Sequence, residues 1–189
     1  MHNEDAEVVD VPDAAGWRKW LSEHHTDDRG VWLVVNRRSS PGGLGYEDAI
    51  CEALCFGWVD STARTLPDGR PTIWFTQRRP GSGWSAPNKA RVTRLIQCDA
   101  LAPPGLAAIQ AAQADGSWSL YDSAEALIEP PELASALDAV PEARAAWDAF
   151  PPGVRKNALA WIAVAKRPQT RAERIERIVS RAELGQRPG

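Results

Sequence analysis

The segment CEALCFGWVDSTARTLPDGRPTIWFTQRRPGSGWSAPN, residues 51–88, decides the fold because it carries a β-hairpin pattern. Two runs with a side-chain period of two, 57–64 and 72–79, predict neighbouring antiparallel strands. The tripeptide Pro-Asp-Gly at 67–69 predicts the turn between them, because proline presets φ and Asp-Gly tolerates positive φ. We therefore expect an antiparallel hairpin within a sheet.

The period of two also assigns side chains to the two faces of this hairpin. Along its first strand it places Asp60 and Arg64 on the same face. Two registers remain open: a turn at residues 68–69 places Asp60 opposite Gln77, and a slip of one residue places it opposite Arg78. The sequence alone does not choose between them.

Tryptophan and arginine side chains are interleaved through the hairpin and the segment that follows it. Indole rings and guanidinium groups form pockets for anionic, flat or phosphorylated ligands, but they also occur in an ordinary packed sheet. A helix that starts near residue 85 directs its free amide groups and positive dipole towards Arg78 and Arg79, which favours an anion there. In the competing interpretation the tryptophans are core residues and the arginines pair with acidic segments. The candidate ligand-binding residues are Trp58, Asp60, Arg64, Trp74, Arg78, Arg79, Trp84 and Asn88.

Charge is nearly balanced over the whole chain but not along it. The 22 basic and 25 acidic side chains give a net charge of −3, which predicts neither a nucleic-acid nor a membrane partner. Residues 1–63 and 99–150 carry −7 and −8, whereas residues 64–98 and 151–189 carry +6 each. Either these segments neutralise one another, or the two basic segments converge on one anion-binding face.

The cysteines and histidines show no pattern for a metal site or a disulfide framework. Cys51, Cys55 and Cys98 are an odd number without a CxxC spacing. Cys51 and Cys55 are one helical turn apart. This spacing is typical of small apolar residues on the buried face of a helix. His24 and His25 belong to a different element, without metal-ligand spacing. We expect no metal and no cofactor.

The N-terminal sequence predicts no export signal. The first ten residues, MHNEDAEVVD, are acidic and lack the apolar stretch of a signal peptide. No run approaches the roughly 18 apolar residues that span a bilayer. Together these features predict a cytoplasmic protein without membrane insertion.

Helical patterns flank the hairpin and fill the C-terminal third. A helix over residues 13–25, capped by Asp13, precedes an apolar run at 31–36 that predicts a central strand. The basic, glycine-rich stretch 37–43 predicts a loop and lacks the residue order of a phosphate-binding loop. The fold class is therefore α+β: a small, mostly antiparallel sheet with flanking helices, followed by an all-helical C-terminal module. Further helices are expected at 46–56, 85–97, 104–114, 131–139, 141–150, 154–166 and 171–184.

The chain divides into an α+β region with the Trp/Arg-rich hairpin, residues 1–130, and a helical module, residues 131–189. Proline opens several helices of this module at the first turn, where its missing amide costs nothing. The helix at 154–166 is apolar almost all round, which predicts a buried bundle member. In the last helix Thr170 and Glu173 are expected to form a capping box.

Three motifs resemble a known bacterial family. They are CFGWVDS and RRPGSGWS in the first half of the chain and AKRPQTRAERI in the second. They resemble the YdeI/OmpD-associated proteins, also labelled bacteriocin-protection proteins, over about residues 17–185. The resemblance implies a protein of the stress-response or bacteriocin-protection type, with a final helical module at about residues 132–184. Because the family name describes a phenotype and not a reaction, the resemblance assigns no catalytic residue.

The first functional hypothesis is a binding module. Its Trp/Arg pocket would hold an anionic or aromatic small molecule, or an acidic segment of a partner protein. A second basic group near the last helix would add to this anion-binding character. The members of this group are Lys166, Arg171 and Arg174.

Two alternatives belong to other classes of protein. One is a small-molecule enzyme with Asp60 as acid or base, in which Arg64 or Arg78 holds an anionic substrate. No Ser-His-Asp, Cys-His or paired-carboxylate arrangement supports it. The other is nucleic-acid binding through base stacking and phosphate contacts, which the net negative charge disfavours.

Overall fold

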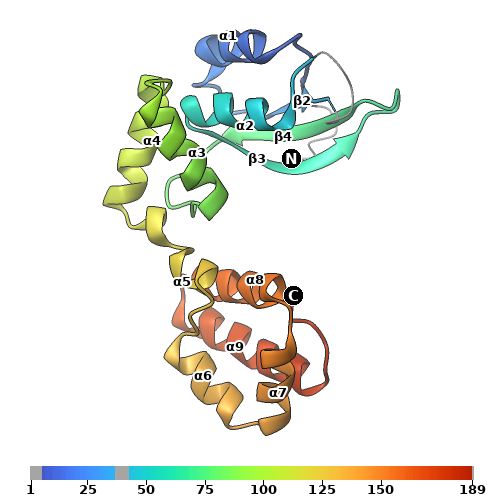
Figure 1. The fold of residues 1–189 in the computed structure, drawn as a ribbon, viewed down its shortest axis with the longest axis vertical. Coiled ribbons are helices and arrows are strands. Elements are labelled where there is room, and N and C mark those ends of the chain that lie inside the picture. The colour runs from blue at the N-terminus through green and yellow to red at the C-terminus, as the bar shows by residue number, and fades with distance from the viewer. Residues whose placement is uncertain (1–5, 37–42, 189) are drawn as a thin grey trace. The chain divides into compact units, whose positions relative to one another are not determined.

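The computed structural model describes residues 6–36 and 43–188 and divides the chain into two compact units (Figure 1). Most of the expected basic loop, residues 37–42, lies outside the described residues. Each unit combines a long segment of the chain with a shorter one. The first unit is Met1–Ser82 with Pro87–Asp115, and the second is Gly83–Ala86 with Gly116–Gly189.

The first unit contains a four-stranded mixed sheet in the order β1-β2-β4-β3. β2 (Val31–Val34) and β3 (Trp58–Thr65) both pair antiparallel with β4 (Pro71–Gln77), as the sequence predicts. β1 (Val8–Val9) adds a short parallel edge strand beside β2. With helices around this sheet and a helical C-terminal region, the α+β class is confirmed.

The turn of the hairpin is one residue longer than a two-residue turn. The amide of Leu66 donates to the carbonyl oxygen of Arg70 at 2.9 Å, which leaves the three residues 67–69 as the loop. Gly69 has a φ of 88°, the left-handed conformation that commonly closes a three-residue hairpin loop. The predicted turn at residues 67–69 is therefore confirmed, whereas the two-residue turn at 68–69 that one of the registers assumed is not formed.

A register shift in β3 changes the faces on which its side chains lie. Asp60 pairs with Phe75 and Ala63 pairs with Ile73, so β3 holds one extra residue between them. Asp60 is therefore opposite neither of the two residues that the alternative registers suggested. Because side chains alternate, the extra residue places Arg64 on the face opposite to Asp60. The prediction that they share a face is wrong.

Helices α1 (Ala14–His24) and α2 (Tyr46–Cys55) cover the same face of the sheet (Figure 1). Trp17 of α1 packs against Phe75 with ring centres 5.6 Å apart, and its indole nitrogen donates to the carbonyl oxygen of Ala49 at 3.1 Å. Asp60 and Phe75 therefore lie on the helix-covered face, whereas Arg64 lies on the other.

Helices α3 (Ala86–Gln97) and α4 (Pro103–Ala114) complete the described part of this region of the chain. α4 approaches the C-terminal end of α2 closely, because it places a glycine at the contact. A Cβ atom on Gly105 would lie 2.3 Å from the carbonyl oxygen of Cys55. This position of α4 therefore requires glycine.

The second unit is helical throughout its regular structure (Figure 1). Proline occupies the first turn of four of its helices, as predicted. A continuous core fills the space between them, with Leu133, Leu137, Trp147, Leu159, Ile162 and Ile178 among its members. Its elements are η2 (Ser117–Ser119), α5 (Asp122–Glu125), α6 (Pro131–Asp138), α7 (Pro141–Ala149), α8 (Pro152–Ala163) and α9 (Pro168–Glu183).

Two details of the helical prediction are wrong. α8 is not buried all round, because it buries Ala158, Leu159 and Ile162 while Val164 beyond its end is exposed. α9 begins at Pro168 without a side-chain cap, so the expected capping box at residues 170–173 lies inside the helix. In the described part of the chain, no helix combines the length and hydropathy that crossing a bilayer requires.

Candidate functional site

An open cavity of about 560 Å³ lies in the first unit, where β2 ends and the hairpin extends away from it. Its described lining is mostly apolar and uncharged, with Arg64 as the exception. A tyrosine at the start of α2 contributes a phenol to it. The lining residues are Val35, Asn36, Tyr46, Ala63, Arg64, Thr65, Pro71, Thr72 and Ile73.

Arg64 stacks on an indole ring of the neighbouring strands. Its guanidinium carbon lies 4.0 Å from the ring centre of Trp32, and Trp32 lies 5.2 Å from Trp74, centre to centre. Its Nε is buried without a hydrogen-bond partner, and no carboxylate of the described residues pairs with it. Within the described part of the chain, an aromatic surface therefore holds this arginine.

Backbone contacts fix the position of this Arg–Trp group. The buried Thr72 donates from its hydroxyl to the carbonyl oxygen of Arg64 at 3.1 Å, across the β3–β4 pair. Gly30 allows Trp74 to approach the chain, because a Cβ there would lie 2.3 Å from the indole ring. Strand pairing then places Trp74 directly opposite Trp32.

The carboxylate of Asp60 is linked to the cavity through a phenol. The hydroxyl of Tyr46 donates to Oδ2 of Asp60 at 3.4 Å. Burial raises the pKa of Tyr46, and the negative charge of Asp60 raises it further. Among the described residues Asp60 has no arginine partner. Asp60 is therefore not one of the acidic residues that neutralise the hairpin arginines in the competing interpretation.

Trp58 lies on the helix-covered face and is fully buried. Its indole nitrogen donates to the carbonyl oxygen of His25 at 3.0 Å, and the ring of Trp20 meets it edge-on with centres 5.7 Å apart. Trp74, by contrast, is half-buried on the other face. The bulge in β3 therefore separates Trp58 and Asp60 from Arg64 and Trp74.

The remaining hairpin arginines follow β4. The amide of Arg78 donates to the carbonyl oxygen of Gly57 at 2.9 Å, which extends the strand pairing by one residue. Arg79 is exposed, and its carbonyl oxygen accepts a hydrogen bond from the amide of Ser82 at 3.1 Å. Neither residue lines the cavity at Arg64.

The last two candidates, Trp84 and Asn88, are both buried. Trp84 belongs to the second unit, where its ring packs against Trp118 with centres 5.0 Å apart. Asn88 belongs to α3, and its side-chain oxygen accepts a hydrogen bond from Nη1 of Arg91 at 2.9 Å. Asn88 therefore orients an arginine of its own helix.

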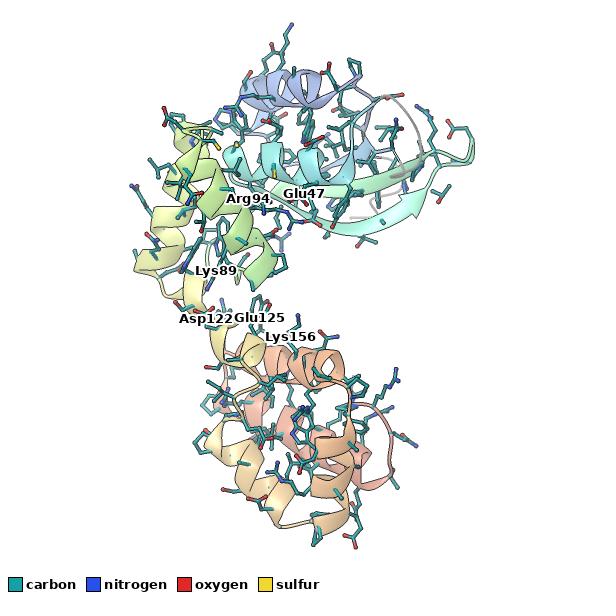
Figure 2. All side chains as sticks on the ribbon, viewed as in Figure 1. Glu47, Lys89, Arg94, Asp122, Glu125 and Lys156 are labelled. Atoms are coloured by element: carbon teal, nitrogen blue, oxygen red, sulfur yellow. The ribbon has the colours of Figure 1, made fainter. Side chains whose placement is uncertain are left out.

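Sequence reasoning missed a carboxylate that joins α2 to α3 (Figure 2). Glu47 accepts hydrogen bonds from Arg91 at 2.7 Å and from Arg94 at 2.8 Å. The hydrogen bond from Arg91, with the positive charge of both arginines, lowers the pKa of Glu47. Here acidic and basic segments neutralise each other.

The second basic group lies at the junction of α8 and α9. Lys166 is exposed between the two helices, and Arg171 lies 3.7 Å from Glu132. Arg174 stacks on Trp161 at 4.9 Å and donates to its carbonyl oxygen. The sequence did not predict that arginines stack on Trp161, because a tryptophan within the apolar stretch of α8 resembles a core residue.

The described residues contain no cluster of three histidine, cysteine or acidic side chains that would hold a metal ion. Cys51, Cys55 and Cys98 are free thiols. Burial raises the pKa of Cys51 and of Cys55, which disfavours their thiolate forms.

Two family models match the chain. Residues 126–185 match the model described as Bacteriocin-protection, YdeI or OmpD-Associated, which confirms the expected resemblance for this part. Residues 9–108, more than half of the chain, match the model described as Domain of unknown function (DUF8412). Searches of curated proteins and of solved structures returned no match. By its N-terminal half, with the bulged hairpin and its cavity, the chain belongs to the DUF8412 family.

Proposed function

We propose that the protein is a binding protein of the bacteriocin-protection or stress type, whose first unit binds a small aromatic anion at Arg64. The observation that carries this proposal is the stacking of Arg64 on Trp32, without a carboxylate partner among the residues that the structure describes. Because Nε of Arg64 is buried, the in-plane donors that a carboxylate or phosphate would meet are those of its two terminal nitrogens.

The surroundings of the Arg64 guanidinium support a ligand with a flat apolar body and one anionic group. The half-buried ring of Trp74 lies next to Trp32, on the sheet face that carries Arg64, and offers apolar surface there. The cavity of about 560 Å³ is lined by Ala63 and Ile73 from the other face of the sheet, so these two side chains are not part of the proposed contact. A flat aromatic carboxylate fits this combination.

We also propose a division of roles along the chain. Residues 1–130 carry ligand binding, and residues 131–189 carry the protection-type role that the matched family model names. This assignment rests on the Arg–Trp group in the first region and on the family match in the second.

Thermal unfolding in the presence of benzoate tests the binding proposal. A ligand that binds the folded state raises Tm with its concentration. We expect benzoate to raise Tm and neutral benzamide to raise it less, because only benzoate offers a carboxylate to Arg64.

The matched variants are Arg64→Gln and Arg29→Gln. Arg29 is exposed and does not line the cavity, so its loss changes the net charge by the same amount. We expect Arg29→Gln to respond to benzoate as wild type does. An equal response of Arg64→Gln would overturn the proposal.

A further inference from the structure

One flank of α9 carries a row of arginines. These residues follow one another at intervals of three or four, which aligns the four within the helix along one stripe, and Arg167 precedes them as the N-cap residue. From residue 167 to residue 181 the row extends about 21 Å, at about 1.5 Å per residue. We call it the arginine stripe, and its members are Arg167, Arg171, Arg174, Arg177 and Arg181.

Trp161 of α8 orders two members of the arginine stripe. The guanidinium carbons of Arg174 and Arg177 lie 4.9 Å and 5.7 Å from its ring centre. Arg174 also donates to the carbonyl oxygen of Trp161. Stacked guanidinium groups keep in-plane donors, and side chains that are already ordered lose less entropy when they bind. The stripe is preorganised for oxyanions.

Within the described residues, most of the arginine stripe has no carboxylate partner. Its one ion pair joins Arg171 to Glu132 at 3.7 Å. Elsewhere in the second unit, Arg144 meets three carboxylates within 3.5 Å. The second unit thus surrounds Arg144 with carboxylates, whereas most arginines of the stripe have no described carboxylate partner. The members without a described carboxylate partner are Arg167, Arg174, Arg177 and Arg181.

We propose that the arginine stripe binds an acidic segment of a partner protein. Arginine pairs with carboxylates through two parallel hydrogen bonds, and an extended segment of about six residues spans the stripe at about 3.4 Å per residue. Leu184 follows Arg177 and Arg181 by seven and three positions and is 70% exposed. A fitting segment is therefore rich in glutamate or aspartate, with an apolar residue at the end near Leu184.

Two features favour an acidic peptide over nucleic acid. The acidic residues Glu173, Glu176 and Glu183 occupy the neighbouring flank of α9, where they repel a polyanion wider than the stripe. Single-stranded nucleic acids stack their bases on open aromatic rings. The ring of Trp161 already carries two guanidinium groups. A narrow acidic peptide avoids the glutamate flank and does not need an open aromatic ring for stacking.

The test measures binding of the full chain to a fluorescent peptide of about twelve residues, glutamate-rich with one terminal leucine, at low salt. We expect the double variant Arg167→Gln/Arg177→Gln to bind about tenfold more weakly. Both side chains are exposed, so circular dichroism should match that of wild type. The control Lys19→Gln/Arg29→Gln removes the same charge from the first unit and should bind like wild type.

Further arms of the same experiment separate the alternatives. Arg177→Lys keeps the charge but loses the planar fork, so we expect an affinity between those of wild type and the double variant. Oligothymidylate of similar length serves as the nucleic-acid probe. The proposal is overturned if oligothymidylate binds more tightly than the peptide, or if the double variant and the control bind the peptide equally.

Discussion

The guanidinium carbon of Arg64 lies 4.0 Å from the ring centre of Trp32, on the sheet face opposite to the carboxylate of Asp60. One extra residue in β3 creates this arrangement. Without it, regular alternation would bring Arg64 to the face of Asp60 and α2. The bulge therefore determines which side chains form the Arg–Trp group.

Deletion of Ser61 tests the role of the bulge. Removing the extra residue forces either Asp60 or Arg64 onto the wrong face, since the strands on both sides must stay paired with β4. We expect a lower Tm and loss of the stabilisation by benzoate. Ser61→Ala keeps the residue count at an exposed position and should change stability by less than about 0.5 kcal/mol. A deletion variant that unfolds and binds like wild type would contradict this role.

Trp58→Phe tests the buried hydrogen bond between β3 and the end of α1. The substitution removes the indole donor to the carbonyl oxygen of His25 and leaves a gap in a fully buried site. We expect a loss of about 1–3 kcal/mol in urea denaturation. Trp74→Phe, at a half-buried ring without such a described bond, should cost less. Equal costs for the two variants would be inconsistent with this assignment.

The contact between Glu47 and the arginines of α3 predicts a dependence of stability on pH. Hydrogen bonds from Arg91 hold the pKa of Glu47 below its ordinary value, so its contribution to stability is present at neutral pH and is lost as pH falls through the lowered pKa. Because this side chain is 52% exposed, solvent weakens the effect. Glu47→Gln should lower Tm at pH 7, and the difference from wild type should shrink at pH 3. A difference that persists unchanged at pH 3 would mean that charge is not the cause.

Glu129→Ala tests the polar network inside the second unit. Glu129 accepts hydrogen bonds from the indole nitrogen of Trp147 at 2.7 Å and from Arg144 at 3.0 Å, with both charged side chains only about a fifth exposed. Its loss leaves the indole donor of Trp147 without its acceptor and removes one of the three carboxylates around Arg144, at a cost of about 2–4 kcal/mol. The rate of backbone amide hydrogen exchange should rise across residues 131–183 relative to wild type. The exposed Glu142→Ala serves as control and should leave the exchange unchanged.

Local rules predicted most of the fold. Asp13 accepts a hydrogen bond from the amide of Gly16 at 2.8 Å, as expected for a helix cap. The apolar run at 31–36 correctly predicted the buried strand β2, and the side-chain period of two correctly predicted β3 and β4. These signals succeed because caps, turns and alternation depend on neighbours within a few residues.

The candidate site was harder to predict because it depends on register. Arg64 and Trp74 were both named, but nothing in the sequence WVDSTAR marks the extra residue that puts them on one face with Trp32. Tyr46 was also missed, because its phenol reaches the cavity from the start of α2, more than a dozen residues from Asp60 in the sequence. Contacts between distant segments leave no short-range pattern.

The most direct test of the central claim is a crystal structure of the protein soaked with 4-bromobenzoate, whose bromine is located by anomalous scattering. The proposed site predicts the carboxylate within about 3 Å of the Arg64 guanidinium, with the bromine on the sheet face of Trp32 and Trp74. A ligand bound elsewhere, with no bromine beside Arg64, would contradict the claim.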